Sequence, residues 1–231
     1  MATPVHCRPQ AYDAFRAAVP ILESEVGLIE AAVAIAMHEL PTAAASDVVQ
    51  RIDALATDIE TRVRGCQRQA RLAHAHVVLF DELGFRGDSD DYLHSRSSYL
   101  PATIVTRRGL PITLVLLYKL VLARLDVPVL GISAPGHFLA WVDGDGAPMI
   151  VDPFAGGAVL TKEDAFRRIE QVTGSRVPRS DELLRPASHR QWIARILRNL
   201  QACFTRTTRV ADVGAMLELA ALLEADDDAS V

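Results

Sequence analysis

The sequence lacks the features that mark secreted, membrane-spanning or nucleic-acid-binding proteins. Its three cysteines, Cys7, Cys66 and Cys203, lie far apart without a CxxC pair, which indicates reduced thiols in a cytoplasmic protein. The chain has no basic start with an apolar run after it, and its densest apolar stretch, 112–123, is interrupted by Lys119 and falls short of the roughly 20 residues of a membrane span. Positive charge is not in excess, since 24 Lys and Arg oppose 29 Asp and Glu, so neither nucleic acid nor an anionic membrane is expected as a partner.

The composition is that of a globular chain, and it changes twice along the sequence. Half of the 231 residues are apolar and 23% are charged. We predict a helical region over 1–83 that packs on the core, a core over 84–187, and a helical pair with an acidic tail over 188–231. The helices before residue 84 carry apolar positions at helical spacing, so each should bury one face. They are expected at Ala11–Ala18, Leu22–His38, Ser46–Gly65 (with Ser46 as N-cap) and Gln67–Leu83.

The middle of the chain changes from one buried helix to short strands. Residues 110–125 are apolar nearly all round, which predicts a helix in the interior, with Pro111 in its first turn, where a missing N–H costs nothing. Branched and alternating residues predict strands over 127–133, 137–142 and 148–152, and Gly156 with Gly157 should end the β region. A further helix opens at Thr161 with Asp164, and others come after it over 188–204 and 210–223. The fold class is therefore α+β.

The last two predicted strands bring together two residues of catalytic type. If their turn is centred between Gly144 and Asp145, paired residue numbers sum to 289, so His137 faces Asp152 with Cβ atoms about 4.5–5.5 Å apart. A carboxylate there accepts from one imidazole nitrogen, fixes the tautomer and leaves the other nitrogen as a base. A slip of one residue would put the two side chains on opposite faces.

The nucleophile that such a pair needs for covalent chemistry is missing from its natural place. The start of a buried helix stabilises a thiolate through free N–H groups and the helix dipole. Here the helix begins Arg108-Gly109-Leu110-Pro111-Ile112-Thr113, without cysteine. Thr113 lies about 200° round the helix from Pro111, so its hydroxyl should be a local cap partner. We expect Cys66 and Cys203 to be packing thiols on helices and Cys7 to lie near a loose terminus.

Other polar residues have structural explanations. Asp88, Asp90 and Asp91 are of the type that binds calcium, but their spacing lacks the bidentate Glu of an EF-hand, so we expect a solvated loop and no metal or cofactor site. His74, His76 and His94 are expected to be ordinary helix or loop residues, Arg107 and Arg108 to lie on the surface, and Phe138, Trp141 and Trp192 to pack in cores.

Five short blocks stand out by their glycines, prolines and aromatic residues. They are Leu83-Gly84-Phe85-Arg86-Gly87, Ser98-Tyr99-Leu100, Arg107-Arg108-Gly109-Leu110-Pro111-Ile112-Thr113-Leu114, Pro135-Gly136-His137-Phe138-Leu139 and Val151-Asp152-Pro153-Phe154-Ala155-Gly156-Gly157. In order and spacing they resemble the SirB1 family of transglutaminase-like proteins, over roughly residues 25–205. The resemblance implies a fold similar to transglutaminases and papain-like peptidases, in which a buried helix packs on a small antiparallel sheet.

The same resemblance implies a catalytic triad that has lost its nucleophile. Catalytic relatives place a Gly-x-Cys at the helix start and a His and an Asp on neighbouring strands. His137 and Asp152 match the last two, and Pro111 takes the place of the cysteine. The resemblance therefore implies a non-catalytic module, a pseudoenzyme, that binds a protein or peptide partner in the cleft between 110–125 and 137–152. Residues 188–224 look like the start of the family's tetratricopeptide-like tail, cut to about one helical pair.

Two other functions stay open. An amide or peptide hydrolase, or an acyltransferase, would use the pair of His137 and Asp152 to activate water or a hydroxyl. A structural interaction protein would act through its helical layer, residues 26–63. The sequence does not identify the partner.

Overall fold

The computed structural model describes residues 3–87, 94–143 and 147–229, and it confirms the α+β class. The chain packs into two units, each assembled from separate stretches of sequence. Residues 1–49, 90–105 and 188–231 belong to the first unit, and residues 50–89 and 106–187 to the second. Helices α3 (Ala45–Glu60) and α5 (Leu100–Thr106) begin in the first unit and end in the second. These units group residues that pack together, which does not test the predicted boundaries at residues 83 and 187. Those boundaries stay a prediction.

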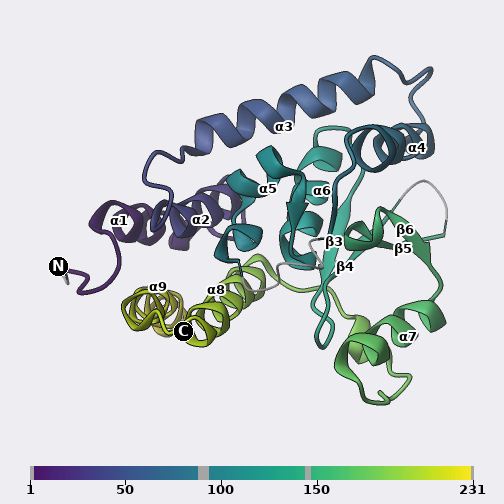
Figure 1. The fold of residues 1–231 in the computed structure, drawn as a ribbon. Coiled ribbons are helices and arrows are strands. Elements are labelled where there is room, and N and C mark those ends of the chain that lie inside the picture. Colours follow the sequence, from purple (N-terminus) through teal and green to yellow (C-terminus); the bar gives the residue numbers. More distant parts are fainter. Residues whose placement is uncertain (1–2, 88–93, 144–146, 230–231) are drawn as a thin grey trace. The chain divides into compact units, whose positions relative to one another are not determined.

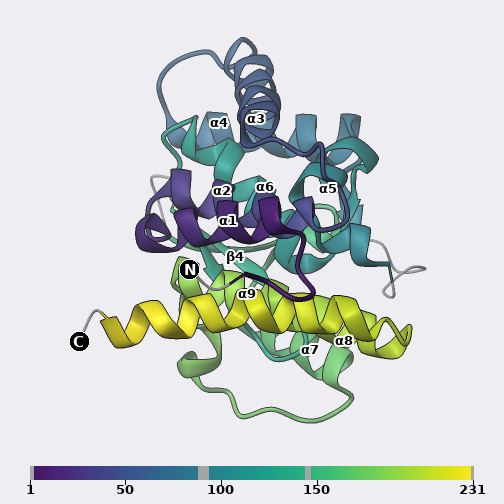
Figure 2. The ribbon, with the colours of Figure 1, turned by 90° about the vertical axis from the view of Figure 1, so that its left-hand side faces the viewer.

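The first unit is a layer of helices. Figure 2 shows α8 and α9 side by side, with α1 next to them. Ser24 and Ser188 cap α2 and α8 by accepting hydrogen bonds from backbone N–H groups three residues on, which satisfies donors that a helix start leaves free. The expectation of one buried face is wrong for α2, where residues 31–36 are all buried. The bounds are α1 Pro9–Ala18, α2 Glu25–Met37, α8 His189–Arg206 and α9 Val210–Ala229.

A polar network ties the end of α2 to the start of α9 inside this unit. Nε2 of His38 lies 2.8 Å from Oδ1 of Asp212, whose other oxygen accepts from Nε of Arg209 at 2.7 Å. Arg209 also pairs with Glu39 at 2.7 Å, and the Tyr99 hydroxyl donates to Glu39 at 2.7 Å. Burial alone would raise the pKa of Glu39, but the hydrogen bonds that it accepts outweigh burial and lower that pKa.

The second unit is built on an antiparallel sheet in the order β3-β4-β5-β6. Helix α6 and helix α7 cover its two faces (Figure 1). Strands β1 and β2 form a short parallel ladder of two residue pairs, and β2 lies just before α6. The bounds are α4 Arg68–His76, a π-helical turn Val77–Glu82, β1 Arg86–Gly87, β2 Arg108–Gly109, α6 Pro111–Ala123, β3 Val129–Ile132, β4 Leu139–Val142, β5 Met149–Asp152, β6 Ala158–Leu160 and α7 Lys162–Thr173.

Helix α6 confirms the predicted interior helix. All of its residues are buried except Lys119, which is half-buried, and Ala123. Lys119 keeps its ammonium satisfied by donating to the carbonyl of Val129 at 3.0 Å. Alternate strand residues point to opposite faces of the sheet. Ile132, Leu139 and Ile150 therefore form one apolar cluster with Ala165, Phe166 and Ile169 of α7.

Three local expectations are wrong. Ser46 lies in the first turn of α3 and is not its N-cap. Strand β6 comes after Gly156 and Gly157, because these glycines adopt positive φ angles of 67° and 78° and turn the chain back to pair with β5. Helix α5 has no counterpart among the expected helices, since seven residues are too few for a helical period to show.

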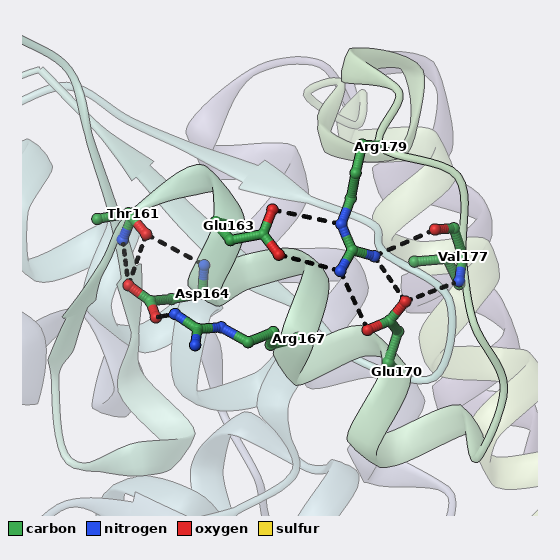
Figure 3. Close-up of polar contacts among 7 residues, drawn as sticks. All are labelled: Thr161, Glu163, Asp164, Arg167, Glu170, Val177 and Arg179. Atoms are coloured by element: carbon green, nitrogen blue, oxygen red, sulfur yellow. Dashed lines mark hydrogen bonds and ion pairs between the residues drawn. The ribbon is translucent and has the colours of Figure 1, made fainter.

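Polar contacts hold both ends of α7 (Figure 3). Thr161 and Asp164 form the predicted opening as a capping box, and the hydrogen bond from the Thr161 side chain lowers the pKa of Asp164. Arg179, from the chain beyond α7, donates to Glu170 and Glu163 at 2.6–3.3 Å. The segment after α7 is thereby held along the helix, and its Ala187 N–H donates to Gly131 O at 2.8 Å on edge strand β3.

Glycine at position 157 is required by space as well as by conformation. A Cβ there would lie 2.2 Å from the ring of Phe80, whereas at Gly156 it would meet nothing within 4 Å. Both residues have positive φ, so Gly156→Ala should cost about 1–2 kcal/mol of unfolding free energy. Gly157→Ala should cost about 1–3 kcal/mol more through overpacking. Urea denaturation of the two variants tests this, and equal losses would contradict the predicted clash.

Candidate functional site

The hairpin register differs from the predicted one, yet it keeps the two candidate residues together. Trp141 pairs with Ile150 and Val142 with Met149, so paired numbers sum to 291 and not 289. Strand β4 begins only at Leu139, which leaves His137 before the strand. The reason is that β4 ends at Val142 and β5 begins only at Met149, so the two strands stop further from the middle of the hairpin than expected. A shift of two preserves the face of every side chain, whereas a shift of one would not.

His137 and Asp152 form a buried hydrogen-bonded pair. Nε2 of His137 lies 3.0 Å from Oδ2 of Asp152, and their side chains are 2% and 0% exposed. Gly136, with a φ of 68°, makes the turn before His137. A Cβ at this position would lie 3.0 Å from Cγ1 of Val172 on α7. Because a carboxylate accepts, Nε2 carries a ring proton; in the neutral imidazole Nδ1 then presents a lone pair. Nδ1 is buried and has no hydrogen-bond partner among the described residues.

The Asp152 carboxylate joins three elements. Its Oδ1 accepts from the backbone N–H groups of Phe154 and Ala155 at 3.1 and 3.3 Å, which caps the 3-10 turn Pro153–Ala155. Its Oδ2 accepts from His137 and also lies 3.6 Å from Nε of Arg168 on α7. Arg168 is absent from the residues predicted for the site, because nothing near it in sequence links α7 to the hairpin. Its side chain is 31% exposed, so it is the solvent-facing part of this site.

Pro111 occupies the first position of α6, as predicted, and is buried. Thr113 is fully buried as well, but its hydroxyl has no hydrogen-bond partner among the described residues, so the expectation of a local cap is wrong. The start of α6 therefore presents neither a thiol nor a hydroxyl at the position that the resemblance assigns to the nucleophile.

The cysteines lie elsewhere. Cys7, expected near a loose terminus, is only 4% exposed, and its N–H donates to Glu218 at 2.8 Å. Burial raises the pKa of the Cys7 thiol to about 12, which makes it a poor nucleophile. Cys203 is buried on α8, and Cys66 is exposed in the connection between α3 and α4 and not on a helix as expected.

An aromatic ring closes the site on one side. Phe154 contacts the His137 ring edge to face, with 5.7 Å between centroids. A Cβ on Gly87 would lie 2.4 Å from the Phe154 ring, so glycine there lets the ring fit. Gly87 pairs with Gly109, two residues before Pro111. In the sequence Phe154 and Gly87 are only members of separate motifs, because their contact joins segments far apart in the chain.

The remaining candidates have other surroundings. Asp88, Asp90 and Asp91 lie outside the described residues. His76 donates to or accepts from the Tyr118 hydroxyl at 2.7 Å, and burial lowers its pKa. Arg107 is exposed, as expected, and Arg108 is half-buried; they donate to the carbonyls of Leu83 and Gly84, respectively. Phe138 and Trp192 are buried as expected, and Trp141 is partly buried. Over the described residues, no group of three or more His, Cys, Asp or Glu side chains is placed to hold a metal ion. None of the described helices has both the length and the apolar character that crossing a bilayer requires.

The fold is a buried helix packed on a small antiparallel sheet, and beside it the structure holds a His and an Asp together. Residues 46–198, more than half of the chain, match the family model of the transglutaminase-like superfamily. The chain belongs to that superfamily.

Its curated relatives include UPF0162 proteins of bacteria. One from Xylella fastidiosa is 37% identical over 142 residues, which cover 60% of this chain and 50% of the relative. Another, from Pseudomonas aeruginosa, is 28% identical over 206 residues, 87% of this chain and 75% of the relative. Human F-box only protein 21 is 34% identical over 104 residues, 42% of this chain and 17% of the relative. The chain thus spans about half the length of the Xylella relatives it matches. No solved structure matches.

Asp152→Asn should move the ring proton of His137 from Nε2 to Nδ1. The amide oxygen keeps the two backbone hydrogen bonds of the turn, so the amide NH2 faces Nε2, which must then accept. Nitrogen-15 NMR of the labelled imidazole distinguishes the two tautomers. Asp164→Asn, at an exposed cap on α7, should leave the His137 signals unchanged. A proton that stays on Nε2 in Asp152→Asn would refute the assignment.

Proposed function

We propose that this chain is a non-catalytic protein of the SirB1 type, a pseudoenzyme that binds a protein or peptide partner. One observation carries the proposal: among the described residues, no thiol lies within hydrogen-bonding reach of either nitrogen of His137. Nε2 is occupied by Asp152, and Nδ1 has no partner in the described part of the chain, which includes all three cysteines. At the helix start, where catalytic relatives carry the nucleophile, this chain has Pro111, whose ring has no reactive atom.

The burial of the pair supports a structural role for it. A side chain that is 2% exposed offers a substrate little contact, and Asp152 uses its oxygens to hold the turn after β5. Removing one partner from such a pair leaves a buried polar group, which costs about 1–3 kcal/mol. In this proposal the pair is retained because the fold of the site depends on it.

Two further parts belong to the same proposal. Helices α8 and α9, joined through residues 207–209, correspond to one helical pair of a tetratricopeptide-like array. A cytoplasmic location fits three free thiols, one of them exposed.

The alternative function is an amide or peptide hydrolase, or an acyltransferase. It is favoured by Nδ1 of His137, which has no hydrogen-bond partner among the described residues and, in the neutral imidazole, can accept a proton as a general base does. In that case His137 would activate water or a substrate hydroxyl without a covalent intermediate. A turnover assay separates this alternative from the leading proposal.

The protein should turn over no amide, and a thiol at position 111 should become reactive. Ammonia release from a glutamine-containing peptide, with and without a primary amine, should match the background of His137→Ala. Pro111→Cys places a thiol at the α6 start, where the helix dipole and His137 should lower its pKa below the usual value of about 8.5. Alkylation by iodoacetamide across pH, mapped by mass spectrometry with Cys66 as reference, measures this.

Two outcomes count against the proposal. Turnover by the wild type that a folded His137→Ala variant loses overturns the non-catalytic function. Alkylation at position 111 that does not change when His137→Ala is added shows that Pro111 does not stand in the nucleophile's place.

A peptide partner should bind beside Asp152 and not on the helical layer. A peptide selected from a random library on the wild type should bind Arg168→Ala about tenfold more weakly, since exposed arginines often dominate interfaces. The matched control is Val26→Asp on α2, where the side chain is 58% exposed and the Kd should not change. Loss on Val26→Asp alone would favour the third function, interaction through residues 26–63.

A further inference from the structure

Nδ1 of His137 is a buried polar atom that neither the fold nor the hairpin uses. A buried acceptor normally finds a donor, because leaving it unpaired forfeits the hydrogen bond it made with water. His137 is 2% exposed, and Nδ1 has no donor among the described residues. Its other nitrogen is held by Asp152, so the imidazole cannot satisfy Nδ1 by exchanging the roles of its two nitrogens without breaking that bond.

The Phe154 ring forms part of the wall around this imidazole. It is half-buried, packs edge to face with the His137 ring, and fills the space that Gly87 leaves by having no Cβ. Its backbone is fixed, since the N–H groups of Phe154 and Ala155 both donate to Asp152. A displacement of the ring would therefore be a rotation about its side-chain bonds, which leaves the turn and the pair of His137 and Asp152 intact.

We propose that Phe154 covers a small binding site at Nδ1 of His137, and that the uncovered site takes a neutral hydrogen-bond donor, an N–H group of a peptide partner. This inference rests on the proposed function, and it specifies what the partner presents to the site. Against the neutral imidazole, a carbonyl or a carboxylate does not match as the contacting group, because its oxygen would face a lone pair. The backbone amide of an extended peptide meets the requirement, and its side chain would replace the Phe154 ring against Gly87.

Covering is tested by the reactivity of His137 toward diethyl pyrocarbonate, which acylates accessible unprotonated imidazole nitrogens. Phe154→Ala should accelerate modification of His137 about tenfold, the factor equivalent to an aromatic contact at the upper end of its usual strength. Exposed His94 serves as an internal reference, and Val159→Ala, at a 59% exposed side chain on β6, is the matched control. Phe154→Leu should give an intermediate rate, and it carries the test if the alanine variant does not fold.

The chemistry of the ligand is tested with two small amides, one with N–H donors and one without. In Phe154→Ala labelled with nitrogen-15 histidine, acetamide should shift the Nδ1 signal of His137 in a saturable way, because its N–H donates to the lone pair. N,N-dimethylacetamide, which has the carbonyl but no N–H, should leave the signal unchanged. In the wild type the same shift should require about tenfold more acetamide.

Two results overturn the inference. His137 reactivity that is the same in folded Phe154→Ala and Phe154→Leu as in the wild type shows that the ring covers nothing. Equal responses to both amides, or none to either, show that the site does not select a donor. These failures are distinguishable from a failure of the proposed function, which depends on turnover and on the response of a selected peptide to Arg168→Ala.

Discussion

The buried carboxylate of Asp152 is the interaction on which the site depends. It accepts from His137 on one oxygen and from two backbone N–H groups on the other, with the Arg168 guanidinium nearby. A fully buried carboxylate is costly unless its lone pairs are satisfied, and here two segments of chain supply hydrogen-bond donors and a third supplies a positive charge. The pre-β4 loop, the turn after β5 and helix α7 consequently share one anchor.

That anchor gives the geometry of the site a structural basis. The partner of His137 also caps a turn and lies against α7, so His137 is held in place by contacts that serve the fold. The start of α6 is under a different constraint. Proline suits the first position of a helix, where no N–H is required, and Pro111 stabilises the helix start in this way. Its saturated ring carries no group that could act as a nucleophile. The pair and the helix start therefore have separate structural reasons for their residues.

The elements that could be predicted are those with a local signal. The interior helix is evident because residues 110–125 are apolar on every side, and the α7 start because Thr161 and Asp164 have capping-box spacing. The nearness of His137 to Asp152 is predicted from a hairpin whose register is wrong by two, and His137 makes the contact from the turn before β4 and not from the strand itself. Strand β6 and helix α5 escape prediction, since a pair of glycines and a seven-residue helix give little periodic signal.

The sequence by itself determined the α+β class, the buried helix with proline at its first position, and the nearness of one histidine to one aspartate. These features arise from periodicity, turn residues and spacing, which act between neighbours along the chain. Only the tertiary structure decided that Arg168 lies beside the carboxylate, that Phe154 rests on His137 and Gly87, and that Nδ1 has no donor among the described residues. The physical reason is that such contacts depend on how distant segments pack, and packing distances have no counterpart in local sequence.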